Sequence, residues 1–243
     1  MTRLEIFPVE GIPEVREGDD LAALVTARAV LADGDVVVVA QKAVSKAEGR
    51  VVRLADVEPS ARARELAGED GDPRRLEVIL REAVRLVRVR GSFVIAETRH
   101  GFVCASAGVD ASNAGEPDAL VLLPLDPDAS AGALRGRLRE LTGRTVGVVV
   151  ADSFGRPWRQ GTTNVAVGAA GLPVLLDLSG RVDATGYELH ATTIAVADEI
   201  AAAAELVMGK LDGIPAAVVR GLDLAGEGAA RDLVLPPARD LFR

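Results

Sequence analysis

The chain has 243 residues, a formal net charge of −8 at pH 7, 49% apolar residues and only 3% aromatic residues. This length and composition predict one globular unit over residues 1–243, either a single domain or two interlocked subdomains, with a core of Ala, Val, Leu and Ile. The acidic balance argues against a nucleic-acid-binding protein, because phosphate backbones are bound by clustered Lys and Arg.

The N-terminal half begins with short strand and helix signals. Residues 4–9 predict a strand, and Asp19 or Asp20 can cap a helix that starts near Leu21. Residues 33–42, DGDVVVVAQK, predict a turn and then a strand that is apolar on both faces. Such strands lie in the middle of sheets covered on both sides, so the pattern favours an α/β fold.

The middle of the chain predicts alternating helices and strands. Residues 72–91 predict one amphipathic helix, and residues 92–108 a hairpin that turns at TRHG. The apolar stripe of that helix contains Leu76, Ile79, Leu80, Ala83 and Leu86. Residues 120–152 predict a strand, a loop with proline, a helix from about Ser130 to a stop at Gly143, and a second buried strand.

The C-terminal part predicts a long Ala-rich helix over residues 188–209 and a last strand over residues 214–222. Residues 236–243 are expected to be an exposed tail or a segment docked on a partner subunit. Cys104, the only cysteine, is expected to be a small buried apolar side chain. The acidic, proline-bearing N-terminus and the lack of a long apolar run predict a cytoplasmic protein without a membrane span.

Several common motifs are missing from the sequence. No P-loop, no G-x-G-x-x-G after a strand and no H-E-x-x-H is present, and Ser153 is not in a G-x-S-x-G elbow. These absences argue against a P-loop NTPase, a histidine-based zinc site and a serine hydrolase.

Oxygen ligands remain as the candidate chemistry. Asp110 and Asn113 follow one apolar strand, and Asp152 and Ser153 follow another. If these are neighbouring strands, the side chains meet at one edge of a sheet, where α/β folds bind ligands. Carboxylate, amide and hydroxyl oxygens suit Mg²⁺ or Mn²⁺. Taken alone, each Asp is more typical of a turn or cap residue than of a metal ligand, so the metal interpretation depends on the pair.

Candidate phosphate ligands follow the first central strand. Lys42 and Lys46 follow the end of this strand, where they either bind phosphate oxygens or are solvated loop cations. The loops EGIPEV, residues 10–15, and MGKLDGIP, residues 208–215, present backbone amides that either contact a nucleotide or belong to ordinary turns.

Five segments in chain order, FPVEGIP, VSKAEGR, GVDASN, DSFGRPWRQG and DGIPAAVVRG, resemble the coenzyme F420-0:L-glutamate ligase (F420-0 gamma-glutamyl ligase) family. The chain is similar to its stand-alone form, without a fused nitroreductase-like domain. The resemblance implies GTP- and metal-dependent ligation of L-glutamate to F420-0 through an acyl phosphate, with further gamma-glutamyl additions. It also implies intertwined mixed sheets with flanking helices in a homodimer, not a simple Rossmann fold.

The resemblance implies site residues as well. Asp110 and Asp152 would bind one divalent metal, Mg²⁺ or Mn²⁺, and Ser153 a second, with a role for K⁺ left open. At the position of another family metal ligand this chain has Lys210, so either Asp212 or the main chain completes the second site, or that site is weaker. The residues assigned to GTP are Ile12, Pro13, Glu14, Val15, Gln41, Lys42, Lys46, Asn113, Met208, Gly209, Lys210, Leu211, Asp212, Gly213, Ile214 and Pro215.

Arg156 and Arg159 are expected to join Asp110 and Asp152 in catalysis by pairing with the phosphodiester and carboxylates of the substrate. Trp158 either stacks on the deazaflavin ring or anchors a core or a dimer interface. Two alternatives stay open: a GTP-dependent amide ligase with another carboxylate acceptor, and a non-catalytic nucleotide- and metal-binding dimer. Nucleic-acid and membrane partners are not expected.

Overall fold

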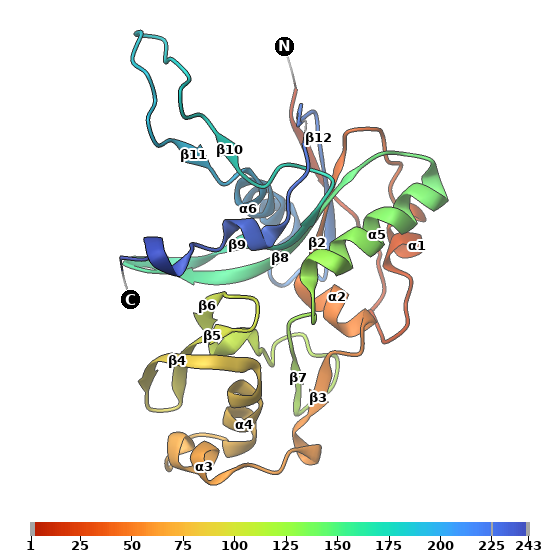
Figure 1. Cartoon of the computed structure of the whole chain (residues 1–243). Coiled ribbons are helices and arrows are strands. Elements are labelled where there is room, and N and C mark those ends of the chain that lie inside the picture. Colours follow the sequence, from red (N-terminus) through yellow and green to blue (C-terminus); the bar gives the residue numbers. More distant parts are fainter. Residues whose placement is uncertain (1–2, 225, 242–243) are drawn as a thin grey trace.

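A five-stranded sheet forms the centre of the larger part of the computed structural model, which describes residues 3–224 and 226–241 (Figure 1). In spatial order its strands are β1 (Glu5–Pro8), β12 (Ala216–Arg220), β2 (Val36–Ala40), β8 (Gly147–Arg156) and β9 (Arg159–Ala170). β2 pairs parallel with β8, whereas the other neighbouring pairs are antiparallel. The fold is therefore mixed α/β and not a Rossmann fold, as predicted.

The valines of β2 explain why this strand lies in the middle of the sheet. Val37 and Val39 face a core shared with the helices α1, α2 and α5, and Val36 and Val38 face the opposite core, which α6 covers. The helices are α1 (Leu21–Thr26), α2 (Gln41–Ala47), α5 (Pro127–Thr142) and α6 (Val196–Met208). Helices on both faces remove every valine of β2 from water, which confirms the predicted doubly covered strand.

Side-chain caps and a glycine define the ends of α1 and α5. The Asp20 carboxylate accepts a hydrogen bond from a first-turn backbone N–H, so Asp20 is the predicted cap that is used. α5 begins at Pro127, earlier than the predicted Ser130, because Asp126 caps it in the same way. Gly143 follows its last turn with φ of 70°, as the predicted stop requires.

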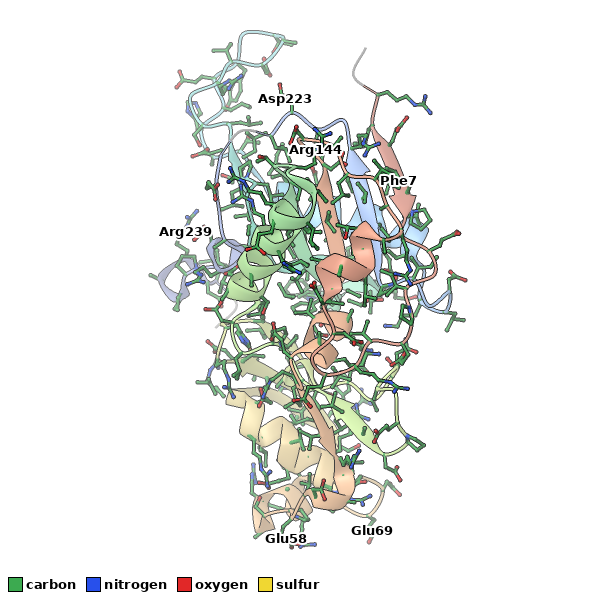
Figure 2. All side chains as sticks on the ribbon, turned by 90° about the vertical axis from the view of Figure 1, so that its right-hand side faces the viewer. Phe7, Glu58, Glu69, Arg144, Asp223 and Arg239 are labelled. Carbon is green, nitrogen blue, oxygen red and sulfur yellow. The ribbon has the colours of Figure 1, made fainter. Side chains whose placement is uncertain are left out.

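The chain between α2 and α5 forms a smaller lobe below the central sheet in Figure 1. Its strands form two antiparallel sheets, β3–β7 and β4–β5–β6, and its buried side chains make a separate core. The elements are β3 (Val51–Arg53), 3-10 helices at Leu54–Asp56 and Ser106–Gly108, α3 (Ala61–Ala67), α4 (Pro73–Glu82), β4 (Ala83–Arg90), β5 (Phe93–Thr98), β6 (Val103–Ala105) and β7 (Ala119–Val121). Figure 2 shows Glu58 and Glu69 at the far end of this lobe, opposite Asp223.

The predicted helix over residues 72–91 is wrong in its second half. α4 ends at Glu82, and residues 83–90 form β4, which pairs with β5. Leu76 and Ile79 are buried as predicted. The alternating valines and arginines after Ala83 favour a strand, and pairing with β5 outweighs the helical spacing. The predicted hairpin over residues 92–108 is confirmed by the antiparallel pairing of β5 with β6.

The C-terminal part also departs from the prediction in one respect. The Ala-rich helix begins at Val196, because the residues before it return from a long excursion, which carries the paired strands β10 (Leu176–Asp177) and β11 (Thr193–Ile194). Two 3-10 helices follow β12, at Ala230–Leu233 and Pro237–Arg239. Residues 236–239 of the predicted tail are exposed, and residues 242–243 lie outside the described residues.

Candidate functional site

Two lysines project from one face of α2, the helix that begins directly where β2 ends. The alternative of a solvated loop is wrong: residues 41–47 are helical, and Lys42 and Lys46 are four residues apart on the same face. Both side chains are largely buried, with 14% and 11% exposure. Burial of two ammonium groups requires acceptors, and each lysine has a carboxylate partner from another element.

Asp110 is the partner of Lys42. Lys42 Nζ donates to Asp110 Oδ2 at 2.6 Å and to the Ser112 carbonyl at 2.8 Å. Burial alone would raise the pKa of Asp110, but the hydrogen bonds from Lys42 and from the Ser112 N–H outweigh it and lower this pKa below 3.8. Asp110 is thus ionised and held against Lys42.

Asp110 and Asp152 do not lie on neighbouring strands of one sheet, so that part of the prediction is wrong. Asp110 pairs with Val121 in an isolated bridge in the smaller lobe, whereas Asp152 continues β8 in the central sheet. The loop after Asp110 reaches α2, and Lys42 joins the two parts of the molecule. The two carboxylates still affect each other's charge, because Asp110 contributes to the raised pKa of Asp152.

Asp152 has the most perturbed carboxyl group of the site. Burial raises its pKa from 3.8 to about 6, the negative charge of Asp110 adds to this, and the Ser153 N–H, Lys42 and Lys210 oppose it. A carboxylate that is this poorly compensated would be stabilised by a further positive charge in the cavity.

Lys46 is paired with Glu14. Lys46 Nζ donates to Glu14 Oε1 at 2.5 Å and to the Asn113 carbonyl at 3.2 Å. Gln41, only 2% exposed, uses its amide nitrogen for Ser45 and the Leu122 carbonyl, and so ties α2 to the end of β7. Gln41 therefore holds α2 against the smaller lobe.

A cavity brings together the loop after β1, the start of α2 and the segment that follows α6. Of the residues predicted at a nucleotide, all line this cavity except Asp212; Asp152 and Ser153 line it too. Asp212 instead turns back against Gly209, where an added Cβ would lie 2.0 Å from its Oδ2. Asp110 lies behind Lys42 and reaches the cavity through that ion pair.

Arg156 and Arg159 lie elsewhere, at the tip of the β8–β9 hairpin. The strand from Asp152 to Arg156 spans about 13 Å, so neither arginine lines the cavity of its own chain. Trp158, in the turn between them, is 83% exposed, which excludes the core role but leaves the stacking and interface roles open. Trp158 borders a separate groove together with Val87, Val103 and Leu235.

Two polar residues of the cavity were not predicted from the sequence, Asn164 on β9 and Glu205 on α6. Ser153 Oγ donates to Asn164 Oδ1 at 2.7 Å, and Asn164 Nδ2 donates to Glu205 Oε2 at 2.8 Å. The sequence held two signals of these residues: a polar Asn within the buried part of β9, and a Glu beside the apolar stripe of α6. Neither signal predicts that the two residues are in contact, because they are 41 positions apart in sequence.

Within residues 3–224 and 226–241, no three His, Cys, Asp or Glu side chains gather closely enough to hold a metal alone. The oxygen donors near the cavity, Asp110, Asp152, Ser153 and Glu205, are nevertheless of the type that Mg²⁺ and Mn²⁺ prefer, and such ions commonly complete their shell with phosphate and water. The site thus fits a hard cation brought with a phosphate ligand. No helix in the described part of the chain is both long and apolar enough to cross a membrane.

Comparison with known proteins shows the family of the chain. The F420-0:Gamma-glutamyl ligase family model matches residues 11–221. Three proteins named coenzyme F420:L-glutamate ligase, from Methanopyrus kandleri, Archaeoglobus fulgidus and Methanothermobacter thermautotrophicus, are 50%, 47% and 44% identical. Each alignment covers 99% of this chain and 97 to 99% of the relative. The chain therefore belongs to the F420-0:gamma-glutamyl ligase family.

Proposed function

We propose that this protein joins L-glutamate to F420-0 with GTP and a divalent metal ion, through an acyl-phosphate intermediate, and adds further glutamates by gamma linkage. The observation that carries the proposal is a cavity lined by Lys42, Lys46 and Asp152, with Asp110 paired to Lys42, in a chain of this family. The family membership supports amide-bond formation, and the cavity chemistry supports a phosphate donor.

The GTP phosphates are assigned to Lys42 and Lys46. The side chains of both lysines are largely buried and already ordered. Little conformational entropy is therefore lost when an anion replaces their present partners. Their partners, Asp110 and Glu14, are 45% and 57% exposed and can turn towards solvent or a cation. Backbone amides of residues 12–15 and 208–215 line the remaining wall and are assigned to the rest of the nucleotide.

The metal ions, two for each site, are assigned to Asp110 and Asp152 for the first and Ser153 for the second. When bound, a divalent cation neutralises charge on phosphate oxygens and orients them for transfer. The raised pKa of Asp152 supports this assignment, because a cation would compensate the buried carboxylate. Lys210 lines the same cavity and adds a positive charge there. Either Mg²⁺ or Mn²⁺ is predicted as the divalent ion, and a role for K⁺ is left open.

The proposed reaction has two steps. A carboxylate oxygen of F420-0 bonds to the γ-phosphorus while the bond to the β–γ bridging oxygen breaks, which releases GDP. The amine of glutamate then attacks the acyl carbon, and phosphate leaves with the oxygen that came from F420-0. Lys42 and Lys46 hold the negative oxygens through both steps. A protein nucleophile is not needed: Cys104 lies outside the cavity and burial raises the pKa of its thiol to about 12.

We also propose a homodimer, formed through an apolar surface around the hairpin tip. Large apolar side chains are exposed along the groove there, with Trp158 at 83%, Leu235 at 46% and Val103 at 43%. Exposed apolar area of this kind is typical of protein–protein interfaces. In such a dimer Arg156 and Arg159, which lie far from their own cavity, could contact substrate bound to the other subunit.

The direct test is mass spectrometry of the products formed from F420-0, L-glutamate, GTP and Mn²⁺. Parallel reactions contain ATP in place of GTP, no metal, or the variant Asp152→Asn, and the Archaeoglobus fulgidus relative serves as the positive control. We expect a product series spaced by glutamyl residues that requires GTP and metal and is lost in the variant. If the relative converts the substrate and this protein does not, the proposal is wrong and another carboxylate acceptor should be sought.

A further inference from the structure

A chain of hydrogen bonds runs from the Ser153 hydroxyl to the carboxylate of Glu205, and both residues line the cavity. Ser153 lies on β8, Asn164 on the paired strand β9, and Glu205 on α6, which packs against both strands. Asn164 is only 5% exposed, so its amide makes its hydrogen bonds inside the protein. Ser153 donates to its oxygen at 2.7 Å, and its nitrogen donates to Glu205 at 2.8 Å.

The carboxylate end of this chain fixes the direction of every hydrogen bond in it. An ionised Glu205 can only accept, so the NH₂ group of Asn164 must face it. The amide oxygen of Asn164 then faces Ser153, and it can only accept, so the hydroxyl proton of Ser153 must point towards Asn164. With that proton turned away, the lone pairs of Ser153 Oγ are left for the cavity.

We propose that Glu205 and Asn164 are positioning residues that present Ser153 as an acceptor to a cation in the cavity. A hydroxyl oriented in this way is suited to coordinate a metal ion and unsuited to donate to a phosphate oxygen. Glu205 acts through Asn164 and need not touch the cation. This inference rests on the proposed function, in that it concerns the metal assigned to Ser153.

The variant Glu205→Gln changes the orientation of the Ser153 hydroxyl while the side chain at position 205 keeps its size. Glutamine has the same size but can donate to the amide oxygen of Asn164, which allows the Asn164 amide to reverse. The reversed amide donates to Ser153 Oγ, takes one of its lone pairs and turns the hydroxyl proton towards the cavity. Residues that orient a metal ligand typically change metal affinity about 10-fold to 100-fold when they are mutated.

The test is a double-mutant cycle on Mn²⁺ affinity, measured by isothermal titration calorimetry on the whole protein saturated with GDP, with a titration of Mn²⁺ into GDP alone as the blank. Ser153→Ala and Glu205→Gln are each expected to weaken Mn²⁺ binding about 10-fold. The double variant should bind Mn²⁺ as Ser153→Ala does, because Glu205 acts only through the hydroxyl. Glu199→Gln, at an exposed position of the same helix, is the charge-matched control and should leave Mn²⁺ affinity unchanged.

Three results would overturn the inference. Additive losses in the double variant would mean that Glu205 contacts the cation directly, and an unchanged affinity in Glu205→Gln would mean that the orientation of Ser153 is irrelevant to the cation. Absence of Mn²⁺ binding to the wild type would remove the proposed metal site as well, which distinguishes that failure from the other two. Thermal unfolding confirms that each variant is folded, and Asn164→Leu, which breaks both hydrogen bonds, should reproduce the loss seen with Glu205→Gln.

Discussion

Replacing Asp152 by Asn should stabilise the metal-free protein while abolishing its activity. Burial raises the pKa of Asp152 from 3.8 to about 6, so between these values the folded protein holds a proton that the unfolded chain has lost. The stability of the wild type therefore falls as pH rises through this window, and the penalty is complete above pH 6. A shift of two units corresponds to about 3 kcal/mol at pH 7.5 and, since the titration is then incomplete, only about 1 kcal/mol at pH 4.5.

The assay is urea denaturation at both pH values, with EDTA present and the protein concentration fixed, because a dimer unfolds in a concentration-dependent way. We expect Asp152→Asn to raise the free energy of unfolding by about 3 kcal/mol at pH 7.5 and by clearly less at pH 4.5. Asp223→Asn, an exposed position labelled in Figure 2, is the control. An equal gain in the free energy of unfolding at both pH values, or a loss at pH 7.5, would show that burial of the Asp152 carboxylate does not destabilise the fold.

Three further predictions concern single positions. Lys42→Ala should weaken GTP binding, measured by calorimetry, by about 10-fold or more; the exposed Arg75→Ala should not, and equal affinities would contradict the phosphate assignment. Gly168→Ala should lower the urea midpoint, corresponding to about 1 to 3 kcal/mol, because its Cβ would lie 2.2 Å from the Pro127 carbonyl oxygen; an unchanged midpoint would argue against this packing. Cys104, whose pKa burial raises to about 12, should not react with a thiol reagent at pH 8 until the protein is unfolded; rapid labelling would contradict its burial.

The strongest sequence signals predicted the core of the fold correctly. The runs of valine in β2 and β8 have no polar face, and this alone required a sheet covered on both sides. The helix ends at Asp20 and Gly143 followed from cap chemistry that acts within a few residues. Local rules of this kind need no knowledge of distant partners.

The errors arose where distant pairing decides the conformation. Residues 83–90 keep a helical spacing of apolar side chains, yet they form β4 because β5 offers a partner strand. Residues 41–47 form α2 without any capping side chain, and Gln41 secures that helix through a contact with Leu122 that the local sequence does not reveal. Short helices are held by tertiary packing more than by propensity.

The candidate site also contains features that the sequence predicted and features that only the packed structure shows. Most residues assigned by the resemblance line one cavity, because the loops after β1 and α6 flank the same end of β2 and β8. The exceptions are Asp110, Asp212 and the hairpin arginines. The ion pair of Lys42 with Asp110 joins the two lobes. It could not be predicted from the local sequence around either residue. The relay from Ser153 through Asn164 to Glu205 crosses three elements and is visible only once they are packed.

The central claim, that this cavity activates a carboxylate by phosphoryl transfer, is tested most directly by following oxygen. F420-0 labelled with ¹⁸O in its terminal carboxylate is incubated with the protein, GTP, L-glutamate and Mn²⁺, and the released phosphate is analysed by mass spectrometry. We expect one ¹⁸O atom in each phosphate that accompanies amide formation, because the carboxylate oxygen leaves with phosphorus. Phosphate without ¹⁸O, formed alongside the amide product, would contradict the acyl-phosphate route.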